Sequence, residues 1–533
     1  MNRDAMLARA ADRRDAWDMI VVGGGATGAG VAVDAAARGY AVLLLERGDF
    51  GAGTSSRSTK LVHGGVRYLR QGQVGLVLGA LRERGRLRQN APHLVRDLPF
   101  VLPCYRRWDV AFYGLGLKAY DLLAGRHRFG RSAVIGAGDV RRRLPTVRAE
   151  GLRGGVVYHD GQFDDARLLI HLLRTAADRG AVVLNYAPVT ALTRGSGGAV
   201  GGVVFRDLET GSEYRAAARV VVNAAGPFCD EVRRLADPGA PPLVAASQGS
   251  HVVLDRSFLP GDHALLVPRT PDGRVLFALP WHGHTLIGTT DVAITSVPRE
   301  PHPTAAEIDF LLETAGRYLD RPPGQGDVLS AFAGVRPLVR ARPGASRAGV
   351  GGLKPGRTAK LSRDHTVRAD QPGVVTITGG KWTTYRQMAE DVVDLAAKLA
   401  GLPRRPCPTR DLRVHGYHDA PGELGSLAAY GSDAPAIEAL AAADPALAEP
   451  LHPALPYRAA EVVWAAREEM ARAVEDVLAR RTRALFLNAA AAAAAAPRVA
   501  DLLARELGRD EGWAAAQVRA FGELARGYQP SSG

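Results

Sequence analysis

The hydrophobic pattern near the start of the chain predicts a strand, a tight turn, a helix and a second strand. Residues 19–22 (Met-Ile-Val-Val) are a short apolar run typical of a buried strand. An Ala- and Val-rich helix is predicted over 29–38 and ends at Gly39, and residues 42–45 (Val-Leu-Leu-Leu) form the next strand. This order is typical of a nucleotide-binding α/β unit.

Similar apolar runs recur along the chain, and the pattern between them changes. Three more buried strands are predicted, at 181–184, 220–222 and 374–377. From about 241 to 330 the runs are shorter and separated by turn residues, with strands expected at 250–254 and 275–279. The pattern predicts an α/β core interrupted by a mostly antiparallel second layer.

The last quarter of the chain has a helical pattern. A linker rich in Pro and Arg at 402–408 separates it from the rest. One helix is predicted from about Tyr457 to Leu487, with an apolar face formed by Val463, Met470, Val474, Val477 and Leu478. The alanine run 489–496 is predicted to be a second helix. We therefore expect two domains, at 17–400 and 404–525.

Composition places the chain among soluble globular proteins of several domains. It has 533 residues, of which 46% are hydrophobic and 23% charged. No apolar run reaches the roughly 18 residues of a membrane-spanning helix. Residues 1–14 carry charges throughout, so we expect no secretory signal and a cytoplasmic protein. Cys104, Cys229 and Cys407 lie far apart without metal-ligand spacing, so neither a disulfide framework nor a metal site is expected.

The net charge of +13 suggests an anionic partner without selecting one. Of the 68 basic residues, 62 are arginine, which composition bias alone can produce. A positive field would attract a phosphorylated substrate, an acidic membrane surface or a nucleic acid. The basic clusters lack the interleaved aromatics that bind single strands, and we expect no nucleic acid. These clusters are 82–88, 106–107, 141–143 and 480–483.

The turn after the first strand carries a dinucleotide-binding motif. Gly23-x-Gly25-x-x-Gly28 supplies the tight turn, the close approach to a pyrophosphate and the packing of helix on strand. The helix N-terminus then offers free N–H groups to the phosphates. Glu46, 18 residues after Gly28, can accept hydrogen bonds from ribose hydroxyls. The following segment 54–69, rich in hydroxyls and glycine, is either a polar loop or a second cofactor contact, and its residues alone do not decide.

At these residues the sequence resembles the FAD-dependent glycerol-3-phosphate dehydrogenases of the D-amino-acid-oxidase-like flavoprotein superfamily. The resemblance runs from about Asp18 to Leu507. Two small departures are Trp382, where leucine is common in the family, and the first sixteen residues, which look like an added tail. The segments that carry the resemblance are 20–30, 54–56, 58–69, 249–251, 287–291, 334–338, 379–386 and 480–487.

The resemblance implies a Rossmann-like FAD-binding domain, an antiparallel-sheet substrate domain and a C-terminal α-helical domain, so that the fold is α/β within an α+β whole. The helix opened by Lys381 and Thr383 would face the pyrimidine side of the flavin, where a reduced flavin gathers negative charge. The residues implied to bind FAD are Gly23, Gly24, Gly25, Ala26, Thr27, Gly28, Glu46, Thr54, Ser55, Val189, Ala225, Gly226, Gly380, Lys381 and Thr383.

The family reaction oxidises sn-glycerol 3-phosphate to dihydroxyacetone phosphate. A phosphate dianion favours bidentate arginine, and the resemblance points to Arg336 and Arg363, with Arg67 and Tyr68 as further contacts. His63 and His251 are both candidates for the base that takes the hydroxyl proton, and either could instead be structural. Lys381 could stabilise the alkoxide or the flavin anion.

The resemblance also implies a membrane quinone as electron acceptor and a peripheral position at the cytoplasmic membrane face; a homodimer is compatible with the sequence. Three alternatives stay open. An oxidase would pass electrons to oxygen. A flavoprotein that binds RNA would use the positive charge. Residues 402–533 could also form mainly an interaction or dimerisation module.

Overall fold

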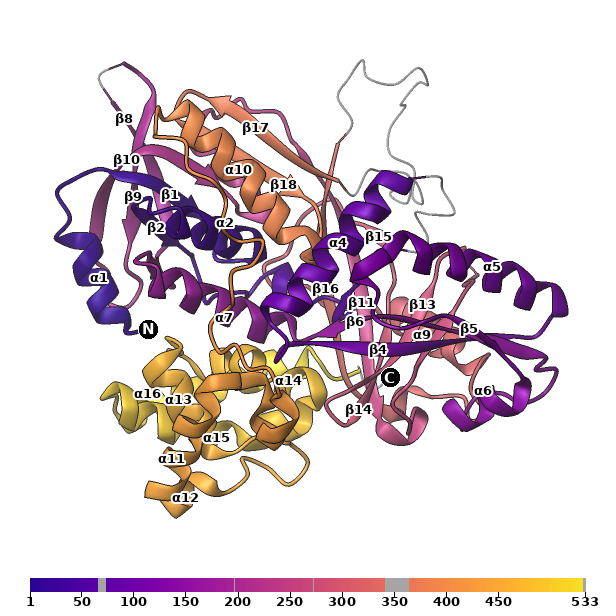
Figure 1. Cartoon of the computed structure of the whole chain (residues 1–533). Helices are drawn as coiled ribbons and strands as arrows, with labels where there is room; N and C mark the ends of the chain where they lie inside the picture. The colour runs from indigo at the N-terminus through magenta and orange to yellow at the C-terminus, as the bar shows by residue number, and fades with distance from the viewer. Residues whose placement is uncertain (66–72, 196, 272, 341–363, 531–533) are drawn as a thin grey trace.

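The computed structural model describes residues 1–65, 73–195, 197–271, 273–340 and 364–530. Two large sheets form the body of the protein, and a group of C-terminal helices packs below the first sheet in the view of Figure 1. Among these residues, no helix combines the length and the apolar character needed to cross a membrane.

The first sheet has a parallel centre that confirms the predicted nucleotide-binding core. Its order is β18-β10-β1-β2-β7, with β17 (His365–Gln371) added antiparallel at one edge. All five predicted strands of the core are present. They are β1 (Trp17–Val22), β2 (Val42–Leu45), β7 (Val182–Leu184), β10 (Glu213–Asn223) and β18 (Val374–Gly379).

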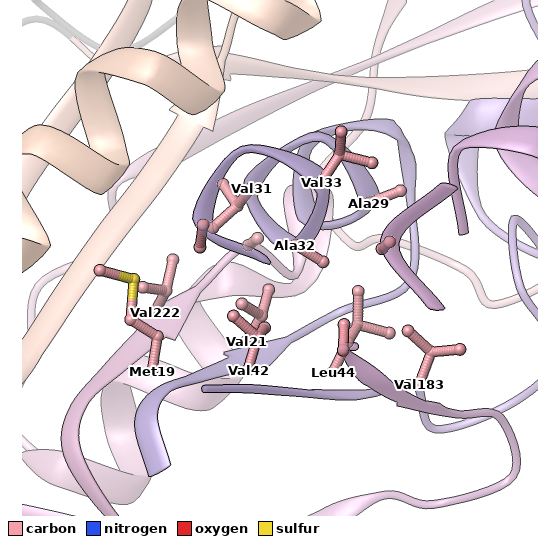
Figure 2. Close-up of a cluster of buried hydrophobic side chains, with 14 of the residues drawn as sticks. Met19, Val21, Ala29, Val31, Ala32, Val33, Val42, Leu44, Val183 and Val222 are labelled. Carbon is pink, nitrogen blue, oxygen red and sulfur yellow. The ribbon is translucent and has the colours of Figure 1, made fainter. Parts of the chain in front are cut away.

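Helix α2 (Ala26–Ala37) covers this parallel centre with small side chains. Figure 2 shows its alanines and valines packed on apolar side chains of β1, β2, β7 and β10. Gly30 allows α10 (Tyr385–Leu399) to approach closely, since a Cβ there would lie 2.9 Å from the Tyr385 ring. Helix α7 (Asp165–Asp178) packs on the other side of α2. The small residues therefore bring the phosphate-binding turn close to the sheet.

The first residues, which look like an added tail in the sequence, form a folded helix. Helix α1 (Arg3–Ala11) buries Met6 and Ala10 in the core of the first sheet. The Arg3 guanidinium donates to Asn185 O at 3.0 Å and to Asp207 Oδ1 at 2.5 Å. The burial of Met6 and Ala10, together with these hydrogen bonds, joins this polar-looking segment to the core of the first sheet.

The second sheet is mostly antiparallel, as predicted, and draws on more of the chain than residues 241–330. Its order is β15-β11-β14-β13-β12-β4-β6-β3, with β16 on β11 and β5 on β6. The later stretch supplies β11 (Val244–Asp255), β12 (Ala264–Val267), β13 (Leu276–Trp281), β14 (His284–Gly288), β15 (Val292–Ala293) and β16 (Val328–Val339). The earlier stretch supplies β3 (Leu61–Val62), β4 (Val95–Cys104), β5 (Ala133–Ile135) and β6 (Gly154–Phe163).

The two stretches join through β4 and β12, which pair in parallel. The helices around this sheet are α4 (Val74–Asn90), α5 (Arg107–Ala124), α6 (Ala137–Arg143) and α9 (Ala305–Gly316). A hairpin of β8 (Val189–Arg194) and β9 (Val200–Arg206) extends the first sheet, and α8 (Cys229–Ala236) follows β10.

The C-terminal region is helical, and its alanine run begins a helix as predicted. Its helices are α11 (Ala434–Ala443), α12 (Pro445–Ala448), α13 (Ala459–Glu468), α14 (Ala484–Leu487), α15 (Ala489–Leu507) and α16 (Glu511–Arg526).

The single helix predicted from Tyr457 to Leu487 is wrong. The chain leaves α13 at Glu468, passes through Met470 at φ 54° and resumes as a π-helical turn over Asp476–Arg481. The Asp476 carboxylate accepts the backbone N–H groups of Arg472 and Ala473, which starts a new turn. The five predicted apolar positions are nevertheless all buried, so the pattern identified the core and not the break.

Candidate active site

A cavity of about 1490 Å³ lies where the two sheets meet. Ligand pockets usually measure roughly 300–1,000 Å³, so this cavity has room for a large cofactor together with a substrate. Most predicted site residues that the structure describes line it. These are Gly23, Gly25, Ala26, Thr27, Glu46, Thr54, Ser55, His63, Val189, Ala225, Gly226, His251, Arg336, Gly380, Lys381 and Thr383.

The remaining predicted residues fall into two groups. Gly24 and Gly28 belong to the turn behind the cavity wall. Arg67, Tyr68 and Arg363, predicted to hold the substrate phosphate, lie outside the described residues.

The Gly-rich turn at one end of the cavity requires glycine for steric reasons. Gly23 has φ +113°, and a Cβ there would lie 2.7 Å from Ala224 O. A Cβ on Gly28 would lie 1.9 Å from Gly23 O, which is backbone and cannot swing aside. The turn therefore delivers the N-terminus of α2 to the cavity, with no acidic residue in the first helical turn to neutralise it.

Glu46 closes the second strand beside this turn. Its Oε2 accepts from Gly24 N at 2.6 Å and its Oε1 from Gly48 N at 3.0 Å. Burial raises the pKa of the Glu46 carboxyl, while the two backbone N–H groups act in the opposite direction. The carboxyl group is thus held rigidly at the cavity wall, where an acceptor for ribose hydroxyls is expected.

The residues present fit a bound dinucleotide. The N-terminus of α2 meets the cavity, and Glu46 lies beside it. At the next strand exit, Gly226 has φ +55°, and a Cβ there would meet nothing within 4 Å, so this backbone faces open space. Ser55 Oγ accepts from Ala26 N at 2.9 Å and joins the segment after β2 to the phosphate-binding helix. FAD would occupy this end through the helix N-terminus and Glu46.

His251, on β11, lies in the other half of the cavity wall and is 2% exposed. Its Nε2 is 2.9 Å from Thr59 Oγ1, and its ring stacks on Phe332 at 4.8 Å. Burial, together with the charges of Lys60 and Arg336, holds the pKa of His251 well below its usual value. The ring is therefore neutral at physiological pH, as a base must be before it takes a proton.

His63 and Lys381 form a neighbouring part of the wall. His63 N donates to Thr383 Oγ1 at 3.2 Å. Lys381 is the N-cap of a short 3₁₀ turn, Trp382–Thr384, that leads into α10, so a helix opens here as predicted. The Trp382 indole Nε1 donates to Ser55 O at 2.9 Å and fixes this turn against the segment after β2.

Arg336 presents a guanidinium to the cavity from β16. Its Nη1 donates to Thr290 O at 3.1 Å and its Nη2 to Thr289 Oγ1 at 3.1 Å. On the neighbouring strand β11, Gly249 leaves the space this group needs, because a Cβ there would lie 2.3 Å from Arg336 Nη2. Asp291 lies 3.6 Å away and partly balances the charge.

Sequence analysis missed four further arginines at the cavity, namely Arg47, Arg57, Arg274 and Arg299. Arg274 donates to Asp291 O at 2.8 Å and lies beside Arg336 through this shared aspartate. Arg57 is buried and donates to Glu300 Oε2 at 2.7 Å. Arg57 stands within the hydroxyl- and glycine-rich segment 54–69, which could have drawn attention to it, whereas nothing in the sequence distinguishes Arg274 among the 62 arginines. Across the described residues, no group of three or more His, Cys, Asp or Glu side chains is arranged to hold a metal ion.

The chain matches two family models. Residues 18–386 match the model for FAD dependent oxidoreductases, and residues 407–514 match the C-terminal domain of alpha-glycerophosphate oxidase.

Similar proteins are known from several organisms. A mitochondrial glycerol-3-phosphate dehydrogenase of Arabidopsis thaliana is 43% identical over 93% of this chain and 84% of its own length. The Homo sapiens mitochondrial glycerol-3-phosphate dehydrogenase is 39% identical over 93% of this chain and 71% of its own length.

Solved structures of similar proteins share this fold. The glycerol-3-phosphate dehydrogenase from Bacillus halodurans, complexed with FAD, is 28% identical and superimposes with a TM-score of 0.79 over 99% of this chain and 98% of that one. An L-alpha-glycerophosphate oxidase from Mycoplasma pneumoniae, at 16% identity and a TM-score of 0.55 over 75% of this chain and 98% of that one, shares the fold. The chain therefore belongs to the FAD-dependent oxidoreductase family and, within it, to the FAD-dependent glycerol-3-phosphate dehydrogenases.

Proposed function

We propose that this protein oxidises sn-glycerol 3-phosphate to dihydroxyacetone phosphate at the membrane surface and passes the electrons to a quinone. The observation that carries the substrate assignment is the pair Arg336 and Arg274 at a cavity that also holds a neutral buried histidine. Guanidinium groups suit a phosphate dianion, and the relatives named above act on glycerol 3-phosphate by name.

The chain's residues divide the work of the oxidation. When bound, FAD supplies the acceptor for the hydride that leaves C2 of the substrate. The C2 hydroxyl proton passes to an imidazole nitrogen as the C=O bond forms, and His251 and His63 are the candidates. Arg336 holds the phosphate and so fixes C2 within the cavity. Lys381, at the opening of the 382–384 turn, stabilises the negative charge that develops.

The membrane assignment is supported by an exposed apolar stripe on α5. Trp108, Leu115 and Leu122 are 76%, 75% and 82% exposed, and with the half-exposed Phe112 they follow helical spacing along one side. The opposite side of α5 is buried through Leu117 and Tyr120. Large exposed apolar patches on a helix are typical of membrane or partner contacts. Figure 1 shows α5 at the outer edge of the second sheet, away from the C-terminal helices.

Basic residues flank both ends of the stripe, which favours an anionic lipid surface. Arg106 and Arg107 stand at its start, Arg126 and Arg128 follow its end, and all four are exposed. Residues of α5 also line the cavity. The apolar side chains of the wall include Leu102, Phe112, Tyr113, Leu117, Tyr158 and Phe277. A quinone leaving the bilayer beside α5 would therefore meet an apolar route into the site.

Anaerobic mixing of the FAD-loaded enzyme with sn-glycerol 3-phosphate tests the reaction. We expect the flavin absorbance near 450 nm to bleach with glycerol 3-phosphate and to persist with glycerol, lactate or D-amino acids. A flavin that stays oxidised with glycerol 3-phosphate overturns the substrate assignment. Rapid oxygen uptake without quinone would favour the oxidase, the activity for which the matching C-terminal model is named.

A vesicle experiment tests the membrane assignment separately. Trp108→Glu with Leu122→Glu should abolish co-sedimentation with phosphatidylglycerol vesicles and slow quinone turnover, while anaerobic flavin reduction stays unchanged. Leu208→Glu, at an exposed leucine on another face, is the matched control and should bind as before. Unchanged vesicle binding by the double variant contradicts the assignment, and a stripe-dependent dimer that ignores vesicles would identify a second copy as the partner.

A further inference from the structure

The motif Arg480-Arg481-Thr482-Arg483 was singled out as a basic cluster, and the reaction proposed above gives it no role. In the structure its three arginines are buried rather than solvated. They lie in or just after the π-helical turn of the C-terminal region and point into the contact with the first sheet's domain. π-Helical turns are rare and frequent at functional sites.

Two of the arginines hold the beginning of the segment that lines the cavity. Arg480 Nε donates to Asp49 Oδ2 at 2.5 Å, and Arg481 donates to both Asp49 oxygens at 2.6 and 2.8 Å. These buried arginines hold the pKa of Asp49 at about 2, although its burial alone would raise it. Asp49 is thus a charged anchor three residues after Glu46.

The third arginine holds the middle of the same segment. Arg483 Nη2 donates to the backbone carbonyl of Ser56 at 2.6 Å and lies 3.6 Å from Asp165 Oδ1. The same carbonyl accepts from Lys60 Nζ at 2.7 Å, and Lys60 also pairs with Asp165 Oδ2 at 2.7 Å. The Lys60 and Asp165 side chains have no exposed surface, so the buried guanidinium of Arg483 and the buried amine of Lys60 donate to one peptide oxygen.

Asp165 extends this cluster along the segment. Its Oδ2 accepts Ser58 N at 3.0 Å and Ser58 Oγ at 2.7 Å. Lys60 has φ +62°, a conformation that side chains other than glycine seldom adopt, and the contacts of its ammonium group hold it there. The segment 56–60 is therefore fixed by Arg483, Asp165 and Lys60 acting as a unit.

The side chains on either side of Ser56 reach the site. Thr54 Oγ1 donates to Val335 O at 2.6 Å, next to Arg336. Ser55 contacts the N-terminus of α2 through its hydroxyl and Trp382 through its carbonyl. Thr59 Oγ1 lies 2.9 Å from His251 Nε2. One peptide carbonyl thus stands between the cofactor contacts and the candidate base.

We propose that Arg483, a residue of the C-terminal helical region, is a positioning residue for the flavin and substrate site, acting through the Ser56 carbonyl and the segment Thr54–Lys60. The C-terminal helices then complete the site rather than form a separate interaction module. The expected effect on FAD binding depends only on the chain's membership of the FAD-dependent oxidoreductase family. Only its effect on reduction rests on the function proposed above.

The test compares Arg483→Met with Arg174→Met. Arg174 is also a buried arginine paired across the same contact, with Asp433 at 2.6 Å, but it does not touch the segment Thr54–Lys60. We expect Arg483→Met to weaken FAD binding, followed by flavin fluorescence, and to slow anaerobic reduction at saturating glycerol 3-phosphate, each by about tenfold or more, as the loss of one charged hydrogen bond predicts. Arg174→Met should lower the melting temperature and leave both quantities within about twofold.

Arg483→Lys keeps the charge and one donor, and should recover most of the FAD affinity and of the visible circular dichroism of the bound flavin. Wild-type FAD affinity in Arg483→Met overturns the proposal. So does an equal loss of affinity in both methionine variants, because that indicates general destabilisation. If Arg483→Met does not fold, Arg483→Gln, which removes the charge, replaces it in the test, and its FAD affinity must then fall below that of Arg174→Met. If glycerol 3-phosphate reduces no variant, including the wild type, the reaction assignment fails and the affinity comparison still stands.

Discussion

Replacing Gly249 by alanine should weaken substrate binding by displacing a side chain on the neighbouring strand. Gly249 pairs with Gly334 in the register of β11 and β16, two residues before Arg336. The added Cβ would lie 2.3 Å from Arg336 Nη2 and 2.6 Å from its Cζ. Ordinary contact needs at least 3.4 Å, so the guanidinium must move by about 1 Å, which a flexible side chain can do without unfolding the strand.

The size of the effect follows from the hydrogen bonds of that guanidinium. Arg336 donates to Thr290 O and Thr289 Oγ1, both at 3.1 Å, so a 1 Å shift breaks at least one of these bonds or the bond to the phosphate. A hydrogen bond from a charged donor contributes about 1.5–3 kcal/mol. The KM for glycerol 3-phosphate should therefore rise by about 10- to 150-fold.

Steady-state kinetics with glycerol 3-phosphate and an artificial electron acceptor measures this effect. FAD affinity should remain within about twofold, because Gly249 belongs to β11 of the second sheet, whereas the phosphate-binding turn follows β1 of the first. Gly326→Ala is the control, since a Cβ there meets nothing within 4 Å. A Gly249→Ala enzyme with wild-type KM would show that Arg336 does not hold the substrate.

Three further outcomes are expected. Gly28→Ala should abolish FAD binding, measured by flavin fluorescence, because its Cβ would overlap Gly23 O; retained binding would contradict the steric argument. Burial raises the pKa of Glu461 to about 7 despite the Tyr430 hydrogen bond, so between pH 4.5 and 7 the folded state binds more protons than the unfolded state. The free energy of unfolding therefore falls by up to about 3 kcal/mol as the pH rises from 4.5 to 7. Glu461→Gln should flatten the dependence of the melting temperature on pH between 4.5 and 7, and an unchanged slope would refute the assignment to Glu461. His415 is partly buried, and hydrogen bonds to two aspartates raise its pKa, so its stabilisation is complete below about pH 6.5 and is lost as the pH rises above that value; His415→Gln should therefore lower the melting temperature more at pH 6 than at pH 9, and an equal loss would refute it.

The parts of the fold that depend on residues close together in the sequence could be predicted from it. The strand at 19–22, the glycine turn and helix α2 are local features, and the structure reproduces them. The break near Met470 depends on the Asp476 carboxylate, which accepts the backbone N–H groups of Arg472 and Ala473. The spacing of apolar residues does not predict such a hydrogen bond. Strands β4 and β6 were missed because prolines and charged residues interrupt the apolar pattern of β4, and glycines and polar residues interrupt that of β6.

The candidate site shows the same division. Residues inside ordered motifs, such as His63 and Ser55, could be named because the motif sets their context. Arg274 reaches the cavity only through the tertiary arrangement that places it beside Asp291. Arg483 was visible as a charge in a basic run, and only the structure reveals that its partner is a peptide carbonyl more than four hundred residues earlier.

The order of strands in the first sheet has a consequence for how the protein is made. β1 pairs with β2 and with β10, and β10 pairs with β18, so the parallel sheet is incomplete until residue 379 has been made. At translation rates of about 5–20 residues per second, the ribosome needs roughly 20–75 s to supply the last of these strands. Until then the edge of β10, which includes the buried Val221 and Val222, lacks its partner strand. Folding of the protein in the cell should therefore depend on chaperones that shield such strand edges until synthesis is nearly complete.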